Sequence, residues 1–500
     1  MPPASAGPWA LDRRTLLSGL AATGLAATLP GCQTVGESLG AIKRVVSGGG
    51  EVPKGPEVDA FLDDVQRRTF NYFWETTELN RGLAPDRFPT PSFASIAAMG
   101  FALTGFVIGV ERGYAPRAEA AKRTLAMLKF LSAAPQGPEA DDRVGYYGFF
   151  YHFLDTRDGM RFEKCEVSTV DTALLMMGVL LAMTYYDAPE EAEIRKLADD
   201  LYRKVDWRWA MTRGAVISMG WTPEAGFIAY DWEAYNEGML VYILGLGAPV
   251  YALEPASWTA WSAKLATYWT DSGDLSQLRF GPLFGHQYSH VWIDFREIQD
   301  AFMRTKGIDY FENSRRATVQ HRNYAMANPD GWRGYGANQW GLTACDGPTD
   351  IELEVDGASR RFRSYSARGV GDFDDGTIAP TAAGGSMPFA PEICLPALMA
   401  MKARHGDDLY GAYGFLDAFN ETFVSEIRLK HGRVVPDKGW FDDDYIGIDQ
   451  GPILAMIENH RTGLIWTIMR RNPYIRAGLT RAGFTGGWLK TSAAPAQAAA

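Results

Sequence analysis

Six apolar segments rich in small residues recur along the chain, and each begins near a polar capping residue. They start near Ser92, Ser168, Asn236, Ser289, Thr381 and Asp449. Apolar character on all sides, with frequent Gly, Ala, Ser and Thr, predicts helices that are buried and whose backbones pack closely. Stretches with charged residues on one face lie between these segments and predict half-exposed, amphipathic helices.

The amphipathic helices are predicted over residues 58–77, 116–131, 190–205, 257–269, 309–327 and 391–405. Each precedes one buried segment, and a further helix is predicted over 463–471. Six outer–inner pairs indicate an all-α fold, an (α/α)6 barrel, in which the starts of the inner helices gather at one mouth. An ordinary large α-domain or an α-solenoid would also be helical, but no repeat of 34 or 40 residues is visible.

Two long loops interrupt the helical pattern, at residues 137–166 and 328–378. Each contains two β-like runs, which predict hairpins turning at Asp158-Gly159 and at Asp356-Gly357. Loops of this length in a compact domain are usually functional or disordered. Because these loops are rich in aromatic residues, we place both at the mouth of the barrel.

Composition narrows the function classes. The 500 residues include 15 Trp and 22 Tyr, which fits either a large core or a cleft where sugar faces stack on rings. A net charge of −11 argues against nucleic acid, because little positive charge is available to neutralise phosphates. No Cys/His cluster has zinc spacing. We expect no cofactor or metal. A neutral oligo- or polysaccharide partner and a monomeric state are further expectations.

The chain begins with what reads as an export signal. Arg13-Arg14 precede an apolar run over 16–29, which is too short to span a bilayer and resembles a twin-arginine signal. The run ends at Cys32 in a lipobox-like stretch, so we expect lipidation there, or otherwise a plain cleaved signal. We predict a signal over 1–32, a flexible tether over 33–57, a catalytic domain over 58–485 and a disordered tail over 486–500. The location would be the periplasmic side of the outer membrane as a lipoprotein, or the periplasm; the anchor would be the sole membrane contact.

Three cysteines remain beyond Cys32. At most one disulfide can form, and Cys165 and Cys345, both in loops, are the better pair. Free buried thiols, Cys394 included, are an equally good interpretation.

Carboxylates at the predicted helix starts are candidates for glycosidic cleavage. Inversion needs a protonated acid and an ionised base, about 6.5–9.5 Å apart. Glu233, between Trp232 and Tyr235 just before the third inner segment, is our general acid. Glu237 falls in the first helical turn, where the helix dipole favours its charged form. Both could instead be plain loop and helix-start residues.

Asp449 opens the sixth inner segment and is our general base, although a helix cap is the alternative. We assign binding or supporting roles to a set of further carboxylates and keep a catalytic role as the alternative for each. They are Glu237, Glu166, Asp171, Asp346 and Asp375. Structural pairing and turn formation compete with those roles. The predicted sugar-contacting residues are Trp232, Tyr235, His286, Gln287, Tyr288, Trp292 and Trp440, with Asp442, Asp443 and Asp444 beside Trp440.

Taken together, several runs resemble glycoside hydrolase family 144, the glucoamylase-like proteins. They include SIAAMGFALTGFVIGVERG, STVDTALLM, DWEAYNEGML, FGPLFGHQYSHVWIDFR, DDGTIAPTAA and GIDQGPIL, and the resemblance covers about Phe61 to Phe484. It implies an (α/α)6 barrel, no catalytic metal, export in Gram-negative bacteria, and hydrolysis of β-1,2-glucan, either endolytic or with release of sophorose. WEAYN resembles the general-acid stretch of inverting glucoamylases, which falls on Glu233. IDQ resembles their base stretch, with Asp449 in place of Glu.

The sequence therefore predicts an inverting β-1,2-glucanase. A glycosidase of another linkage, a lipid-anchored glycan-binding protein without turnover, and a polysaccharide lyase are the alternatives.

Overall fold

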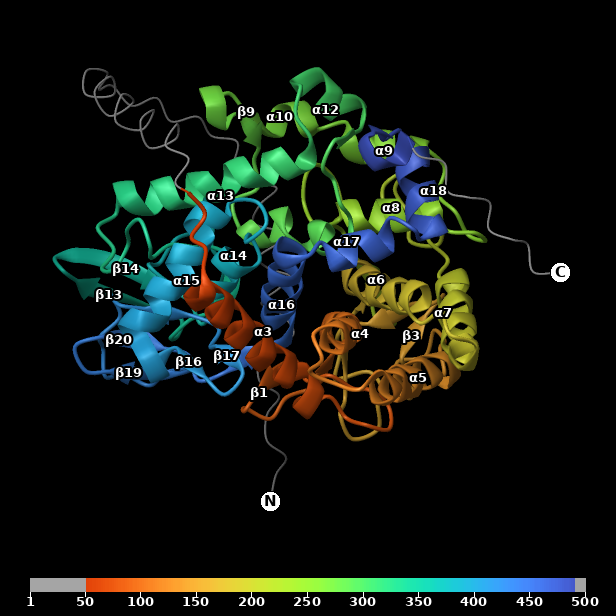
Figure 1. Ribbon diagram of the computed structural model, residues 1–500, viewed down its shortest axis with the longest axis horizontal. Coiled ribbons are helices and arrows are strands. Elements are labelled where there is room, and N and C mark those ends of the chain that lie inside the picture. The colour runs from red at the N-terminus through yellow and green to blue at the C-terminus, as the bar shows by residue number, and fades with distance from the viewer. Residues whose placement is uncertain (1–50, 491–500) are drawn as a thin grey trace.

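The computed structural model describes residues 51–490 (Figure 1). The predicted signal, the lipidation site Cys32, most of the tether and the last ten residues lie outside this range. The described chain is mainly helical, with many short strands between the helices. No helix in residues 51–490 combines the length and the apolar character needed to cross a membrane.

Helices are present at all six predicted inner segments. They are α4 (Ile96–Glu111), α6 (Thr169–Tyr185), α8 (Met239–Gly247), α11 (Tyr288–Trp292), α14 (Pro380–Gly384) and α16 (Gly447–Arg461). Every residue of α8 is buried, as the apolar pattern predicts. Ser95 and Ser168 cap α4 and α6 by accepting from the backbone N–H of Ala98 and Asp171.

Small residues let the inner helices cross closely. A Cβ placed on Gly178 of α6 would lie 2.3 Å from the carbonyl oxygen of Gly100 in α4. A Cβ on Gly100 would lie 2.4 Å from the carbonyl oxygen of Leu174. The backbones of α4 and α6 therefore touch where glycine removes the side chain, which explains the small residues in these segments.

Helices also occupy the predicted outer segments. They are α3 (Pro56–Thr76), α5 (Arg117–Ala133), α7 (Ala192–Lys204), α9 (Ala256–Ser262) with α10 (Leu265–Tyr268), α13 (Tyr310–Ala327) and α15 (Pro391–His405). The fourth predicted helix is thus split in two. The helix predicted over 463–471 is α17 (Leu464–Met469), while α12 (Ala301–Lys306) and α18 (Pro473–Arg481) were not predicted. Figure 1 shows α5 and α7 at the periphery and α4 and α6 nearer the centre.

The strands form small antiparallel sheets. The largest has the order β3 (Gly145–Tyr146), β4 (Phe149–Tyr151), β6 (Val167–Ser168), β7 (Gly220–Thr222) and β8 (Gly226–Phe227). The pairs are β1 (Arg87–Phe88) with β21 (Tyr445–Ile446), β2 (Ala94–Ser95) with β5 (Phe153–Leu154), β9 (Trp269–Thr270) with β10 (Gln277–Leu278), β11 (Ile298–Gln299) with β22 (Thr485–Gly486), β12 (Ala344–Asp346) with β15 (Tyr365–Ala367), β13 (Ile351–Val355) with β14 (Ala358–Phe362), and β16 (Tyr410–Gly411) with β17 (Gly414–Phe415). A three-stranded sheet has the order β18 (Phe419–Asn420), β20 (Gly439–Phe441), β19 (Arg433–Val435).

One predicted hairpin is confirmed and the other is displaced. The strands β13 and β14 turn at Asp356-Gly357, both with positive φ, as a two-residue hairpin requires. In the first loop the hairpin ladder turns at Tyr147-Gly148 instead of Asp158-Gly159. A single bridge, Leu154 to Arg161, spans Asp158-Gly159, because the strand before that turn pairs with β2.

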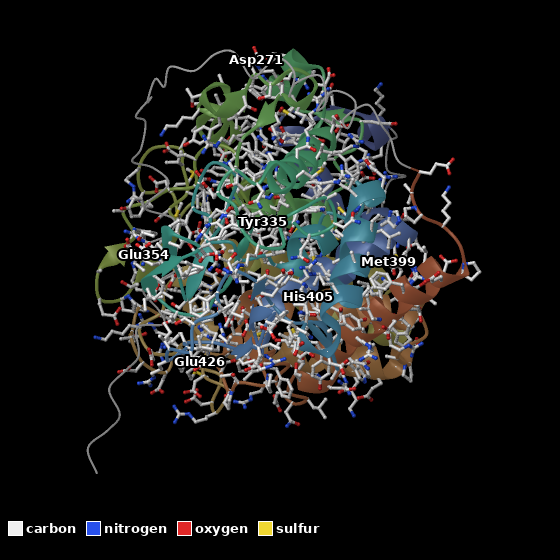
Figure 2. The ribbon with its side chains drawn as sticks, turned by 90° about the vertical axis from the view of Figure 1, so that its left-hand side faces the viewer. Asp271, Tyr335, Glu354, Met399, His405 and Glu426 are labelled. Carbon is white, nitrogen blue, oxygen red and sulfur yellow. The ribbon has the colours of Figure 1, made fainter. Side chains whose placement is uncertain are left out.

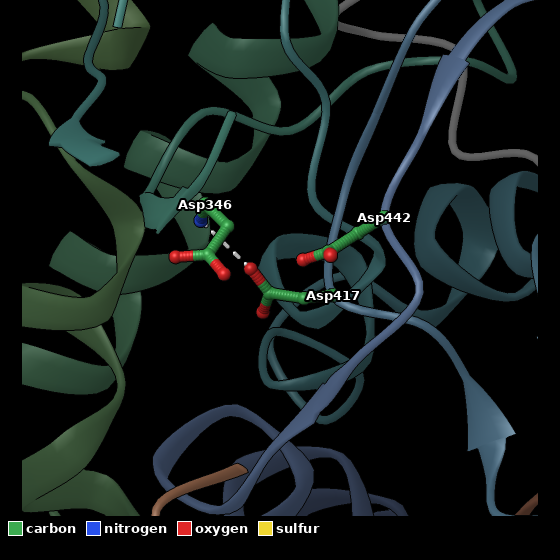
Figure 3. Close-up of side chains that lie close together, drawn as sticks. All are labelled: Asp346, Asp417 and Asp442. Atoms are coloured by element: carbon green, nitrogen blue, oxygen red, sulfur yellow. Dashed lines mark hydrogen bonds between the residues drawn. The ribbon is translucent and has the colours of Figure 1, made fainter. Parts of the chain in front are cut away.

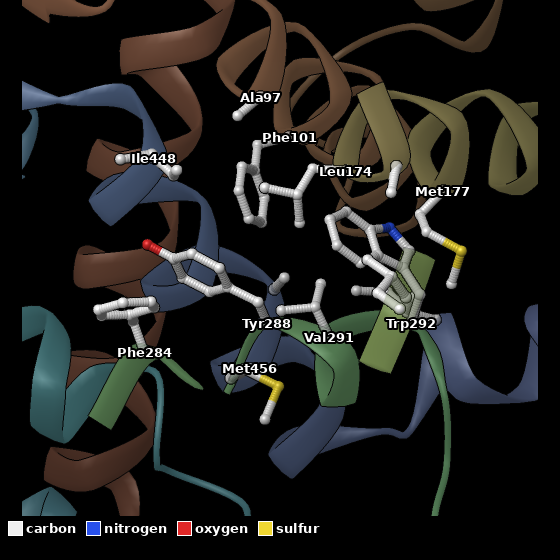
Figure 4. Close-up of a cluster of buried hydrophobic side chains, with 14 of the residues drawn as sticks. Ala97, Phe101, Leu174, Met177, Phe284, Tyr288, Val291, Trp292, Ile448 and Met456 are labelled. Atoms are coloured by element: carbon white, nitrogen blue, oxygen red, sulfur yellow. The ribbon is translucent and has the colours of Figure 1, made fainter. Parts of the chain in front are cut away.

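The main core lies where α4, α6, α11 and α16 meet. Figure 4 shows Phe101, Leu174, Trp292 and Met456 in one cluster of buried hydrophobic side chains. A smaller cluster, which includes Trp332, Phe362 and Trp440, packs beneath the β13–β14 hairpin. Figure 2 shows side chains filling the interior around His405, with Glu354 and Glu426 at the periphery. The cysteines Cys165, Cys345 and Cys394 are buried and free, so the considered pairing of Cys165 with Cys345 is absent from the structure.

Candidate active site

Backbone hydrogen bonds tie together the starts of three inner helices. At the start of α16, the N–H of Gly447 donates to the carbonyl of Asp86, 2.7 Å away. At the start of α4, the N–H of Ile96 donates to the carbonyl of His152, at 3.2 Å. The N–H of His152 in turn donates to the carbonyl of Glu166, which lies just before α6. Side chains near these starts therefore come from distant parts of the sequence but share one region.

Side chains connect the other three inner helices to this region. Trp232 Nε1, before α8, donates to Thr169 Oγ1 of α6, 2.9 Å away. Thr381 of α14 donates to the carbonyl of Asp449 in α16, also at 2.9 Å. Gln287 Nε2, before α11, donates to the carbonyl of Ala382 in α14. The starts of α8 and α11 meet where the rings of Tyr235 and His286 lie 5.0 Å apart.

Glu237, one residue before the N-cap of α8, has the properties of a proton donor. Its side chain is 5% exposed, and Oε2 has no hydrogen-bond partner within the described chain. Burial raises the pKa of Glu237, a backbone hydrogen bond opposes this and the negative charge of Asp171 adds to it, so that the pKa lies at about 7. This carboxyl is therefore about half protonated at neutral pH.

Asp171, in the first turn of α6, lies in a small polar network. It accepts a hydrogen bond of 2.6 Å from the hydroxyl of Ser168. His152 lies between two carboxylates, with Nε2 3.4 Å from Asp171 and Nδ1 3.2 Å from Glu166. The sequence-predicted residues Glu166, Asp171 and Glu237 are thus brought together around α6 and α8.

Glu233, the predicted acid, lies in a different setting. Its Oε2 accepts a hydrogen bond of 2.6 Å from Nζ of Lys264, and its side chain is 38% exposed. The carboxylate of Glu233 thus forms an ion pair at the surface, whereas Glu237 is buried and has no such partner. These surroundings suit a general acid less well than those of Glu237 do.

Asp449, the predicted base, lies in the first turn of α16 and is 4% exposed. Its carboxyl shares a hydrogen bond with Asp417, which lies between β17 and β18. Asp417 also accepts a hydrogen bond of 2.8 Å from the backbone N–H of Asp346. Asp449 is therefore held rigidly beside a group of buried acids.

Three of these acids, Asp346, Asp417 and Asp442, converge with carboxylate oxygens within 4.8 Å of one another (Figure 3). Burial, followed by the charge of Asp346, raises the pKa of Asp417 to about 7, and the same causes raise the pKa of Asp442 well above its ordinary value. Of the residues in 51–490, these three have spacing that a metal ion could use. Protons bound to these carboxyls can offset their negative charge in the same way as a metal ion would.

Arg87, in β1, provides fixed positive charge to this group. Its Nη1 lies 2.6 Å from Asp346 and 3.5 Å from Asp444. Burial alone would lower the pKa of Arg87, but the charges of Asp346 and Asp86 raise it above its ordinary value. Nδ1 of His431 lies 3.4 Å from Asp346, so the group also contains a titratable base.

Several predicted sugar-contacting rings are buried in helix packing. Trp292 is fully buried, stacks on Phe101 and donates from Nε1 to Thr104 Oγ1. Trp440 is also fully buried and donates to the carbonyl of His431. Trp232, Tyr235, His286, Gln287 and Tyr288 are each at most 6% exposed and lie at the helix starts described above. In this conformation these side chains pack inside the region where the starts of the inner helices meet.

Asp375 is engaged in a buried ion pair, and its partner Arg368 also donates to the carbonyl of Asp346. Asp375 accepts hydrogen bonds of 2.6 and 2.8 Å from the guanidinium of Arg368, and both side chains are fully buried. This bidentate pair fixes the segment that leads into α14.

Sequence reasoning missed Arg87, His152, Asp417 and His431. Two of them lie within apolar runs, His152 in Phe149–Leu154 and Asp417 in Gly414–Phe419. A charged or imidazole side chain within such a run must be buried, and buried charge needs a partner. That signal could have identified Asp417 and His152.

Known proteins resemble this chain over most of its length. The protein family described as "Putative glucoamylase" matches residues 229–473. An exo β-1,2-glucooligosaccharide sophorohydrolase from Parabacteroides distasonis is 28% identical over 457 residues, which are 85% of this chain and 58% of that relative. The chain thus spans less than two thirds of the length of this curated relative.

Two solved structures share the fold. A "putative glucoamylase" from Bacteroides uniformis is 32% identical with a TM-score of 0.75, and the match covers 88% of this chain and 100% of that one. An endo-β-1,2-glucanase from Chitinophaga pinensis, in complex with sophorotriose and glucose, is 26% identical with a TM-score of 0.72, over 87% and 100% of the two chains.

Proposed function

The chain belongs to the glucoamylase-like family, which includes β-1,2-glucanases and sophorohydrolase relatives, and on that premise we propose that it hydrolyses β-1,2-glucan. Cleavage would be endolytic or would release sophorose, and would invert the anomeric carbon. The observation that supports this most is the presence of two buried carboxyls at the starts of different inner helices, Glu237 with a raised pKa before α8 and the rigidly held Asp449 in α16.

We further propose that the six inner helices close into an (α/α)6 barrel. Contacts between successive helix starts support closure. The order around the ring is α16, α4, α6, α8, α11 and α14. Each helix start contacts the next, and α14 contacts α16. Such a ring would gather Asp171, Glu237 and Asp449 around one axis.

In the proposed reaction, Glu237 donates its proton to the glycosidic oxygen as the bond to the anomeric carbon breaks. Asp449 accepts a proton from a water that attacks the same carbon from the opposite face, so the new hydroxyl has the inverted configuration. Asp417 positions Asp449 through their shared hydrogen bond. Both carboxyls are regenerated when they exchange protons with solvent.

A pair of variants tests the acid. Glu237→Gln removes the proton but keeps the shape of the side chain, so kcat should fall about 10²–10⁴-fold. Glu233→Gln should cost less than that, because Glu233 is paired with Lys264. A large loss in Glu233→Gln with near-normal turnover in Glu237→Gln would return the role to Glu233.

A panel of linkage-defined glucans tests the substrate. We expect reducing ends to be released from β-1,2-glucan. Release from an α-linked glucan alone would favour the second candidate, a glucoamylase-type enzyme, which the description of the matched family supports. Binding of β-1,2-glucan without any release would indicate a non-catalytic glycan-binding protein.

We also propose that the protein is exported and anchored through Cys32, since Arg13-Arg14 and the apolar run precede it. Fractionation of cells that express the full chain should place it in the outer membrane. Cys32→Ser should release it to the soluble periplasmic fraction, whereas an unchanged distribution would argue against lipidation.

A further inference from the structure

One face of the five-stranded sheet carries mostly aromatic side chains. The register pairs Tyr146 with Phe149, Val167 with Tyr151 and Trp221, and Trp221 with Phe227. Because paired residues share a face and side chains alternate along a strand, these six side chains lie on the same side of the sheet. Phe149, Tyr151 and Val167 are buried, whereas Tyr146, Trp221 and Phe227 are half-exposed.

Trp209, from the turn after α7, packs onto the exposed part of this face. Its ring centroid lies 4.7 Å from that of Phe227, 5.4 Å from Tyr146 and 5.9 Å from Trp221. Tyr147 stacks on Trp209 at 4.9 Å with an interplanar angle of 21°. We call Tyr146, Tyr147, Trp209, Trp221 and Phe227 the aromatic platform.

Tyr147 occupies a position that tyrosine seldom takes. It is the first central residue of the hairpin turn and has a φ of 51°, followed by Gly148 at 84°. Such turns favour Asn, Asp or Gly at that position, because a bulky side chain with positive φ is strained. The ring is 44% exposed, so burial does not compensate for the strain. An exposed ring held at a strained turn indicates a role in binding.

The turn itself is held firmly. The carbonyl of Tyr147 accepts a hydrogen bond of 2.9 Å from the N–H of Asp206, and the N–H of Gly148 donates to Oε1 of Gln136. A Cβ on Gly148 would lie 2.4 Å from the carbonyl oxygen of Lys204, at the end of α7. The hairpin therefore fits tightly against α7, and a ligand that stacks on these rings would pay little entropy to order them.

The platform is also connected to the candidate active site. Trp221 pairs with Val167, and the next residue, Ser168, caps α6 and hydrogen-bonds with Asp171. A polymer bound at the starts of the inner helices must extend beyond them. Exposed Tyr and Trp rings offer flat apolar surface with polar edges, which suits the faces of uncharged sugar rings.

We propose that the aromatic platform is a second binding site for the β-1,2-glucan chain, outside the residues that cleave it. This inference rests on the proposed function for the identity of the glycan. The platform holds the part of the polymer that extends from the cleavage point, so it contributes to the affinity for long chains more than for short ones.

The test uses Tyr147→Asn, because Asn tolerates positive φ and the variant removes the ring while keeping the turn. KM for long β-1,2-glucan should rise at least about threefold relative to KM for a short β-1,2-oligosaccharide. Mobility in gels that contain β-1,2-glucan should be retarded less than that of the wild type, and the melting temperature should not fall. The matched control is Tyr268→Ala, which removes a ring that is 38% exposed on α10 and should leave both measurements unchanged.

An unchanged KM ratio and unchanged gel retardation in Tyr147→Asn would overturn the platform while leaving the proposed function intact. If the wild type neither cleaved nor bound β-1,2-glucan, both proposals would fail. A dimer that dissociates in Tyr147→Asn, with no change in glucan retardation, would assign the platform to contact between copies of this chain and would also overturn the proposal.

Discussion

The raised pKa of Glu237 makes a prediction about how activity depends on pH. At pH 6 about 90% of a carboxyl with a pKa of about 7 is protonated, and at pH 8 about 10% is. If Glu237 is the general acid, kcat/KM for β-1,2-glucan should fall on the alkaline side near pH 7, with a slope of about tenfold per pH unit.

The variant Asp171→Asn should shift the alkaline limb of the pH–activity profile, and the structure defines the direction of that shift. The charge of Asp171 raises the pKa of Glu237, so its removal lowers that pKa and moves the alkaline limb to lower pH. Asn keeps the shape of the side chain and can still contact Ser168. The assay is reducing-sugar release at sub-saturating glucan from about pH 5 to pH 9. An alkaline limb that does not move in Asp171→Asn would refute the coupling.

The same shift has a consequence for stability. The folded pKa of Glu237 is raised above the unfolded value of 4.5, so the folded state binds more protons between pH 4.5 and about 7. Its contribution is therefore fully present below pH 4.5 and is lost as pH rises through 7, a change of about 3 kcal/mol. In Glu237→Gln the free energy of unfolding, measured in urea at several pH values, should decrease less over this range.

Three further predictions concern packing, charge burial and the base. Gly178→Ala places a methyl group 2.3 Å from the carbonyl oxygen of Gly100, so urea unfolding should show a loss of about 1–3 kcal/mol; no loss would mean that α4 and α6 separate freely. Arg368→Met leaves Asp375 buried without its partner and should cost about 3–5 kcal/mol, with part of the loss restored by adding Asp375→Asn; equal stability of the single and double variants would contradict this. Asp449→Asn should lower kcat about 10²–10⁴-fold while glucan binding in affinity gels persists, and near-normal kcat would exclude Asp449 as the base.

Much of the helical fold could be predicted from the sequence because a buried helix needs apolar residues on all its sides, and this pattern is visible along the chain. The inner segments are apolar on all sides, and helices lie at each of them, from Ile96–Glu111 to Gly447–Arg461. The turn at Asp356-Gly357 was predictable because both residues accept positive φ. The turn at Tyr147-Gly148 was not, since tyrosine is rarely placed there and Asp158-Gly159 offers the stronger local signal.

The candidate site was predictable in its helix starts but not in its detailed contacts. Glu166, Asp171, Glu237 and Asp449 are found where the inner helices begin, as the capping pattern indicates. Whether a carboxyl there keeps its proton depends on neighbours that are remote in sequence. Glu233 adjoins aromatic residues in sequence, yet its side chain pairs with Lys264, a contact that no local pattern reveals.

The most direct test of the account is the course of β-1,2-glucan digestion followed by proton NMR. The protein is added to linear β-1,2-glucan, and the anomeric signals of the first products are recorded before mutarotation equilibrates them. We expect sophorose or longer β-1,2-oligosaccharides whose new reducing ends appear first as the α-anomer, as single displacement at a β-linkage requires. Initial appearance of the β-anomer would contradict the assignment of Glu237 and Asp449 as acid and base, and the absence of any cleavage would contradict the proposed function itself.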